Sequence, residues 1–302
     1  MLVTSKEIMT KARENAYSVI SPSIDSEMCL AAATEVAEEE RAPLIYNIRV
    51  AEKFQYGSFV SDFRECVQQA RRWAERASVP IAVHLDHAHT LEDVATGINY
   101  GYTSITLEPK IQGFDEYKEQ VRQWTELVHA AGISVEGVLP RLTWEQLGKR
   151  GEDLEIKARA NTESDLAFEF TDPELLKEFV DYTGVDTIAV WVGNRFDRTK
   201  KMGAQPALIN LELLKELSDA VDIPLMLHGG SSIKSDNFGD AQKLGIARVN
   251  VGTALRRGAA AAVRRATEDD ANQNSFYLIR DGYKAALPEY VRLSGSAGKA
   301  DE

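Results

Sequence analysis

Ionisable side chains gather at the end of one apolar run. The run Val79–Val83 leads directly into His84, Asp86 and His87, and a helix start follows at Thr90. This is the pattern of a buried parallel strand whose carboxyl end opens into an active site. A carboxylate beside imidazoles can bind a metal ion or transfer protons. We therefore expect the chemistry of this protein at this strand end.

A second apolar run ends in the same way, at His228. Residues 223–227 precede it, and Gly229, Gly230 and Ser231 follow it. Backbone amides of a glycine-containing turn can approach an anion closely. Three of the five histidines of the chain thus lie on two strand ends, one of them beside a candidate anion site.

The elements that position these residues follow an alternating order. Apolar runs that suit strands covered on both faces are separated by stretches with helical amphipathic spacing, such as Asp115–Ala131 and Asp172–Thr183. The predicted strands are Tyr17–Ser21, Leu44–Arg49, Ile81–Asp86, Ser104–Glu108, Ser134–Leu139, Thr187–Val192, Pro224–His228 and Ala247–Val251. This alternation predicts a (β/α)8 or TIM barrel, an α/β fold. A doubly wound open sheet is the alternative, but residues 17–26 lack the glycine fingerprint that it needs at its first turn.

The chain shows no internal domain boundary. We therefore expect a single domain over residues 1–293 and a flexible tail over 294–302. The longest irregular connection, 140–171, is polar and charged. It predicts a lid or an interaction element on the carboxyl face of the barrel, and the alternative is a surface excursion without a function.

Composition excludes several classes of protein. The net charge of −12 provides no basic footprint for nucleic acid. No apolar run reaches the roughly 20 residues that a membrane span needs. Cys29 and Cys66 are the only cysteines, and both lie in helical patterns, which favours free thiols in a reducing compartment. With a polar N-terminal segment, these features predict a cytoplasmic protein whose partner is a small-molecule substrate.

The chain resembles the class II, metal-dependent fructose- and tagatose-bisphosphate aldolases. The segments that carry the resemblance, in the family's order, are His84-Leu85-Asp86-His87, Phe170-Thr171-Asp172-Pro173 with Thr183-Gly184-Val185-Asp186, Leu227-His228-Gly229-Gly230-Ser231 and Val249-Asn250-Val251-Gly252-Thr253-Ala254-Leu255-Arg256. The resemblance implies a lyase that cleaves a ketose bisphosphate into dihydroxyacetone phosphate and an aldehyde. In this family a zinc ion on three histidines polarises the ketone as a Lewis acid.

The resemblance also assigns a role to each matching residue. Asp86 matches the acid that shuttles a proton on the aldehyde oxygen, and His87 and His228 match the first and third zinc ligands. The residues that match the positions holding the substrate phosphate are Gly229, Gly230, Ser231, Asn250, Thr253 and Lys200.

The metal-ligand set departs from the family pattern. Phe196 stands where the family has its second zinc histidine, and a phenyl ring cannot bind zinc. Two histidines make a poor catalytic zinc site, which normally needs three protein ligands. We therefore expect the three-histidine zinc site to be absent. The alternative is that Asp197, His89 or Glu108 supplies the missing ligand.

Cationic residues are gained around the same position. Arg49 and Lys110 replace serines of the family pattern at the second and fourth strands, and Arg195 precedes Phe196. A divalent ion nearby would be repelled, since like unit charges about 4 Å apart cost about 4 kcal/mol at an effective dielectric of roughly 20. We expect Arg49 and Arg195 to bind the substrate. For Lys110 three roles stay open: a Schiff base with a substrate carbonyl, anion binding, or an incidental surface position.

These features predict an aldolase-like lyase that acts on a small phosphorylated or carboxylated carbonyl compound. Asp86 and Lys110 are its candidate catalytic residues. The alternative is a non-catalytic barrel that binds a ligand or a partner protein. By analogy with the family we expect a homodimer or homotetramer, with the terminal helix Ser275–Leu293 as a candidate interface.

Overall fold

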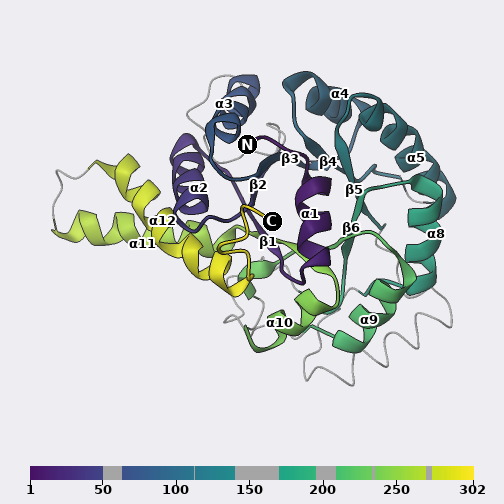
Figure 1. Ribbon diagram of the computed structural model, residues 1–302. Helices are drawn as coiled ribbons and strands as arrows, with labels where there is room; N and C mark the ends of the chain where they lie inside the picture. Colours follow the sequence, from purple (N-terminus) through teal and green to yellow (C-terminus); the bar gives the residue numbers. More distant parts are fainter. Residues whose placement is uncertain (50–62, 112, 140–169, 195–208, 233–234, 270–273) are drawn as a thin grey trace.

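Parallel strands form a closed barrel surrounded by helices (Figure 1). The computed structural model describes residues 1–49, 63–111, 113–139, 170–194, 209–232, 235–269 and 274–302. Within these ranges the sheet has eight strands in the order β1-β8-β7-β6-β5-β4-β3-β2, and every pairing is parallel. A bridge between Ser23 and Asn47 joins the ends of β1 and β2 and closes the ring. The structure therefore confirms the predicted TIM barrel.

The strands and helices alternate along the chain as predicted. The strands are β1 (Val19–Pro22), β2 (Leu44–Arg49), β3 (Ile81–Ala88), β4 (Ser104–Leu107), β5 (Ser134–Val138), β6 (Thr187–Val190), β7 (Leu225–Leu227) and β8 (Ile246–Val251). The helices are α1 (Ser5–Glu14), α2 (Glu27–Glu39), α3 (Phe63–Arg76), α4 (Leu91–Tyr100), α5 (Phe114–Ala130), α8 (Pro173–Thr183), α9 (Leu211–Ala220), the 3-10 turn η2 (Gly230–Ser232), α10 (Ser235–Lys243), α11 (Thr253–Asp269) and α12 (Ser275–Leu293).

Capping residues end the helices sharply, as α8 illustrates. The Asp172 carboxylate accepts hydrogen bonds from the backbone nitrogens of Glu174 and Leu175, both at 2.9 Å. Pro173 occupies the first helical position, where no backbone donor is needed. Gly184 ends the helix with a φ of 67°, in the left-handed region that favours glycine. The chain therefore turns back to the sheet within a few residues.

The barrel interior is layered along its axis. At the amino-terminal end α1 lies across the opening, as Figure 1 shows, and packs Ile8, Met9 and Ala12 against an apolar layer of strand residues. That layer consists of Val19, Ile45, Ala82, Val138, Ala189, Met226 and Ala247. A polar layer follows toward the carboxyl ends of the strands. A second apolar cluster fills the space between the strands and the outer helices.

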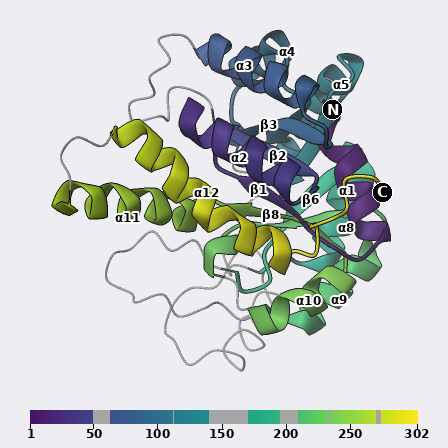
Figure 2. The same cartoon turned by 60° about the vertical axis from the view of Figure 1, so that its left-hand side comes forward.

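Helices α11 and α12 form an arm that projects from the barrel (Figures 1 and 2). A Cβ atom on Gly258 would lie 2.6 Å from the carbonyl oxygen of Gly282, and one on Gly282 would lie 2.5 Å from that of Gly258. Only glycine allows the two helices to cross this closely. Helix α12 also packs on α2 and so ties the base of the arm to the barrel.

The last residues pack onto the amino-terminal end of the barrel, although we expected a flexible tail over 294–302. Ser294 is fully buried, and the backbone nitrogens of Gly298 and Ala300 donate to the carbonyl oxygens of Glu40 and Arg41 at 2.8 and 3.0 Å. Backbone hydrogen bonds hold this segment in place without a large apolar surface. Its composition therefore gave no sign of packing and suggested a flexible tail.

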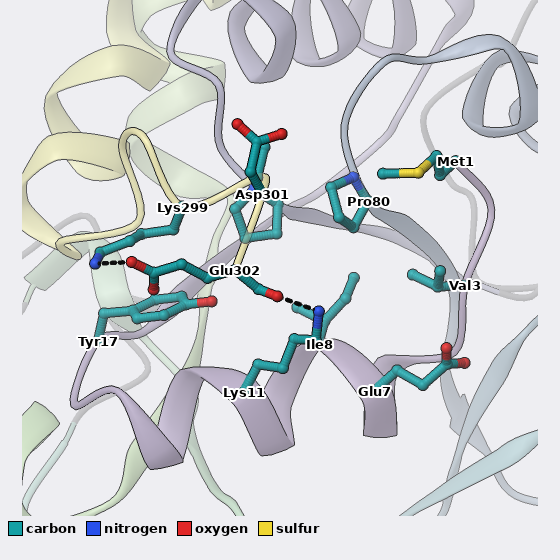
Figure 3. Close-up of a pocket in the computed structure, with 12 residues that line it drawn as sticks. Met1, Val3, Glu7, Ile8, Lys11, Tyr17, Pro80, Lys299, Asp301 and Glu302 are labelled. Carbon is teal, nitrogen blue, oxygen red and sulfur yellow. Dashed lines mark hydrogen bonds and ion pairs between the residues drawn. The ribbon is translucent and has the colours of Figure 1, made fainter.

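A cavity of about 410 Å³ lies at the same end of the barrel (Figure 3). Tyr17, Lys11 and Lys299 line it, and the Lys299 ammonium pairs with the Glu302 carboxylate at 2.5 Å. Burial raises the pKa of the Tyr17 phenol to about 12. The cavity lies opposite the carboxyl ends of the strands, the end where TIM barrels carry their active sites.

Most of the predicted long connection over 140–171 lies outside the described residues. Cys29 and Cys66 are free thiols, as predicted. Among the described residues, no helix combines the length and the apolar character needed to cross a membrane.

Candidate active site

The carboxyl end of β3 brings Asp86 and His87 to the mouth of the barrel. Strand geometry predicts that His87 faces away from Asp86, because neighbouring side chains alternate. The pairing of β3 with β4 shifts between Leu85 and Ala88, and His87 has a φ of 64°. This bulge places the His87 Nε2 3.4 Å from the Asp86 Oδ1. Both groups can therefore act on one bound molecule.

Asp86 is a buried carboxylate held by two cationic partners. Its side chain is 1% exposed, and its Oδ2 accepts a hydrogen bond from the Arg49 Nε at 2.8 Å. Burial alone would raise the pKa of this carboxyl, but the charges of His87 and Arg49 outweigh burial and hold the pKa far below its usual range. These contacts favour the ionised form of Asp86.

His87 lies between two carboxylates. Its Nδ1 is 2.8 Å from the Oε2 of Glu108, which directly follows β4. Burial acts to lower the pKa of His87, but Asp86 and the hydrogen bond to Glu108 outweigh it and raise the pKa. The backbone oxygen of Glu108 also lies 2.7 Å from the His89 Nδ1. Asp86, His87 and Glu108 therefore form a line of groups along which a proton can move.

Four aromatic rings stack across the site. The ring centroids of Trp191 and His228 are 5.5 Å apart, those of His228 and His87 5.3 Å, and those of His87 and His89 6.0 Å. Burial, followed by the charge of His87, lowers the pKa of His228 to about 3. The Asn250 amide nitrogen lies 3.4 Å from the Nδ1 of this neutral imidazole. The surroundings thus favour the neutral form of His228 and the protonated form of His87.

The turn after β7 packs against the start of α11. Gly229 has a φ of 77°, and a Cβ atom on Gly230 would lie 2.2 Å from the Cγ1 of Val249. The Ser231 Oγ accepts a hydrogen bond from the backbone nitrogen of Ala254 at 3.2 Å, within the first turn of α11. Backbone amides at a helix start favour an anion, and TIM barrels often bind phosphate after strands seven and eight.

Asn250 and Thr253 border the same turn. Asn250 lies in β8, and Thr253 is the first residue of α11. A Cβ atom on Gly230 would lie 2.9 Å from the carbonyl oxygen of Asn250, and Ser231 is hydrogen-bonded to Ala254, the residue after Thr253. The structure therefore brings these five predicted binding residues together.

Charged residues also lie one layer deeper in the barrel, and sequence reasoning missed the central one, Arg248. Its Nη1 donates to the Glu136 Oε2 at 2.7 Å and lies 3.1 Å from the His84 Nε2, and its Nη2 donates to the Asn47 Oδ1 at 3.2 Å. All four side chains are buried. Burial and Arg248 together hold the pKa of His84 well below its usual value.

A second strand irregularity explains the inward direction of Arg248. Leu225 pairs with Ile246, whereas Met226 pairs with Arg248, so β8 bulges at Ala247. The available sequence signal was a cation within an otherwise apolar strand. That cation needs a buried partner, and Glu136 supplies it.

The remaining predicted residues lie apart from the buried cluster or outside the described residues. Lys110 is exposed just beyond β4. Arg195, Phe196, Asp197 and Lys200 lie outside the described residues, so their predicted roles stay predictions.

Comparison with known proteins shows the family. The model named fructose-bisphosphate aldolase class-II matches residues 3–299 of the chain. The chain belongs to the class II fructose-bisphosphate aldolase family. This is a family of lyases, in agreement with the coarser part of the functional prediction.

Two curated relatives span almost the whole chain. The uncharacterised protein YdjI of Escherichia coli is 28% identical over 295 residues, which cover 96% of each chain. The D-tagatose-1,6-bisphosphate aldolase subunit GatY of Klebsiella oxytoca is 31% identical over 293 residues, which cover 96% of this chain and 95% of GatY.

Solved structures of the family share the fold. The crystal structure of the YdjI aldolase from Escherichia coli superposes with a TM-score of 0.81 at 26% identity, and the match covers 99% of this chain and all of that one. The fructose-bisphosphate aldolase of Campylobacter jejuni gives a TM-score of 0.78 at 16% identity over 99% of this chain and 97% of its own. The second match concerns the barrel fold alone.

The zinc ion that the family implies finds no complete ligand set among the described residues. No group of three or more His, Cys, Asp or Glu side chains in that part of the chain is arranged to hold a metal. His87 directs its two nitrogens at Asp86 and Glu108, and its ring stacks on His228 rather than converging with it on a shared point. A catalytic zinc normally needs three protein ligands. The described donors therefore do not fit a three-ligand site.

Proposed function

We propose that this protein is an aldolase-like lyase that makes or breaks a carbon–carbon bond in a small phosphorylated or carboxylated carbonyl compound, without the family's three-histidine zinc site. The observation that carries this proposal is the line Asp86–His87–Glu108 beside the anion-binding turn. A barrel that only binds a ligand has no need for a buried base in contact with a charged imidazole.

The arrangement supplies both proton transfers that aldol cleavage requires. Asp86 accepts the proton of the substrate hydroxyl, that carbon becomes an aldehyde, and the carbon–carbon bond breaks. The bond electrons move toward the neighbouring carbonyl group, and His87 donates a proton to its oxygen to give an enol. The enol then takes a proton on carbon from Asp86 and returns its hydroxyl proton to His87. Both residues end the cycle as they began it.

The turn after β7 holds the anionic end of the substrate. This turn presents backbone amides and the hydroxyl groups of Ser231 and Thr253. The match of Lys200 to the family lysine implies the same role for that residue. Removing the Ser231 hydroxyl should weaken inorganic phosphate as a competitive inhibitor. We assign Lys110, which is exposed, to anion binding rather than to a covalent intermediate.

Metal content and activity together test the zinc part of the proposal. Protein purified and dialysed against a chelator should retain far less than one zinc per chain and keep its lyase activity. Phe196→His would restore the family's second zinc histidine and complete the set of three, so this variant should gain stoichiometric zinc. Stoichiometric zinc in the dialysed wild-type protein would show that Asp197, His89 or Glu108 acts as a substitute ligand and would overturn this part. A loss of activity that zinc restores would do the same.

We also propose that the protein is a homodimer or homotetramer of the cytoplasm. Phe276 and Tyr277, at the start of α12, are 39% and 58% exposed on the projecting arm. Free Cys29 and Cys66 thiols support a reducing compartment. Light scattering on a size-exclusion column should give at least twice the mass of one chain, and the double variant Phe276→Ser/Tyr277→Ser should shift it toward one chain. A monomeric wild-type protein would refute the assembly.

A further inference from the structure

Arg49 reaches from the buried acid to the open mouth of the barrel. It ends β2 and is the register partner of Asp86 in β3. Its Nε donates to the Asp86 Oδ2 at 2.8 Å. The Arg49 side chain is 43% exposed, whereas that of Asp86 is 1% exposed. The guanidinium group therefore contacts the buried Asp86 through its Nε, and part of the Arg49 side chain is open to solvent.

The outer edge of this guanidinium group is available for a ligand. An arginine has five N–H donors in a rigid planar fork, and the contact with Asp86 uses the one on Nε. Within the described ranges, Arg49 makes no other hydrogen bond or ion pair. Its two terminal nitrogens therefore offer a pair of parallel donors next to Asp86.

The anion that Arg49 would bind differs from the one in the glycine turn. In the closed sheet β1 lies between β2, which carries Arg49, and β8, which carries Asn250. The turn and the start of α11 thus occupy one side of the mouth, and Arg49 occupies another. A group bound by Arg49 lies beside the atom that exchanges a proton with Asp86, not at the far end of the substrate.

Two oxygens side by side in one plane fit such a fork, and at least one of them should carry charge. A 2-oxo acid presents its keto oxygen and one carboxylate oxygen in this way, and its reactive carbon is attached to the keto carbon. We infer that Arg49 selects a 2-oxo acid as the carbon nucleophile of the reaction. This inference rests on the proposed lyase function and specifies its substrate class.

The corresponding step balances without a further reactant. Asp86 accepts a proton from the carbon next to the keto group, and the electrons of the broken C–H bond form the carbon–carbon double bond of an enol. The keto oxygen receives a proton from His87 while Arg49 holds the carboxylate. When the enol adds to an aldehyde, its hydroxyl proton returns to His87 and the new alkoxide takes the proton from Asp86.

Proton exchange with solvent tests the inference without knowledge of the aldehyde. In D₂O the protein should replace the methyl protons of pyruvate by deuterium, as followed by proton NMR. The comparison probes are hydroxyacetone, which has the ketone but no carboxylate, and dihydroxyacetone phosphate. The variants are Arg49→Ser and Arg49→Lys, and Arg72→Ser at an exposed arginine of α3 is the control with the same change of charge.

The informative quantity is the ratio of kcat/KM for pyruvate to that for hydroxyacetone. Any effect of Arg49 on the position of Asp86 acts on both ketones and cancels in this ratio. Arg49→Ser should lower the ratio about tenfold to hundredfold, because this factor corresponds to the binding free energy of a hydrogen bond to a charged group. Arg49→Lys should fall between wild type and Arg49→Ser, and Arg72→Ser should leave the ratio unchanged.

Two results would overturn the inference. One is an unchanged ratio in Arg49→Ser. The other is exchange of hydroxyacetone or dihydroxyacetone phosphate by a wild-type protein that leaves pyruvate untouched, which would leave the lyase function standing. Exchange of none of the three compounds would count against the proposed function itself.

Discussion

Removing one member of the buried pair Arg248–Glu136 should destabilise the barrel strongly. In Arg248→Met the Glu136 carboxylate loses its partner at 2.7 Å while it remains fully buried. Removing one member of a buried ion pair costs about 3–5 kcal/mol of unfolding free energy. Burial already raises the pKa of Glu136, so this carboxyl can take up a proton once the arginine is lost. We therefore expect the lower end of that range, about 3 kcal/mol.

This free energy converts into a measurable change of melting temperature. At about 2.1 cal/mol/K per residue, the 302 residues give an unfolding entropy of about 0.6 kcal/mol/K. A loss of about 3 kcal/mol then lowers Tm by about 5 °C. Arg265→Met, the same substitution at an exposed position of α11, should change Tm by less than about 1 °C.

A double-mutant cycle separates the pair from its surroundings. Arg248→Met/Glu136→Leu removes both charges, so it should be less unstable than the sum of the two single variants by at least about 1 kcal/mol. Reversible urea unfolding of the four proteins gives this coupling energy directly. Additive free energies, or an Arg248→Met variant as stable as Arg265→Met, would refute the reasoning, since the pair would then contribute nothing of its own.

Three further predictions follow from the site. Folding lowers the pKa of His228 from 6.5 to about 3, so the unfolded chain takes up this proton at a higher pH than the folded protein. The free energy of unfolding therefore decreases as the pH falls from 6.5 to about 3, by up to about 1.4 kcal/mol per pH unit. Urea titrations at several pH values should show a shallower drop for His228→Asn, and equal slopes would contradict this. Gly230→Ala should lower Tm and weaken phosphate binding because its Cβ has no room, whereas Gly239→Ala, in an open position of α10, should be neutral or stabilising. Borohydride with pyruvate should leave no adduct on Lys110, and an adduct that disappears in Lys110→Ala would instead establish a Schiff base there.

The fold could be predicted from the sequence because each signal was local. Strands buried on both faces give continuous apolar runs, and caps such as Asp172-Pro173 and Gly184 mark helix ends through the backbone geometry that they require. The carboxyl ends of parallel strands meet at one face, so the grouping of Asp86, His228 and the glycine turn followed from the alternation of strands and helices.

The details that the sequence did not predict are shifts of one residue. Regular alternation would direct the His87 side chain away from Asp86, but the bulge in β3 turns it toward Asp86. The bulge at Ala247 likewise turns Arg248 into the barrel. Both depend on pairing with a neighbouring strand, which is a long-range property. The packing of residues 294–302 was missed for a similar reason, since its backbone partners Glu40 and Arg41 are far away in the sequence.

The charged layer around Arg248 also constrains how the ring of strands can close. It joins β2, β3, β5 and β8 through Asn47, His84, Glu136 and Arg248. If the pairing of β8 shifted by one residue, the Arg248 guanidinium group would face the apolar helices. The Glu136 carboxylate would then stay buried inside the barrel without its partner. A misaligned closure is therefore costly, whereas an all-aliphatic lumen would tolerate several alignments. The polar residues inside the barrel therefore favour one alignment of β8 with its neighbouring strands.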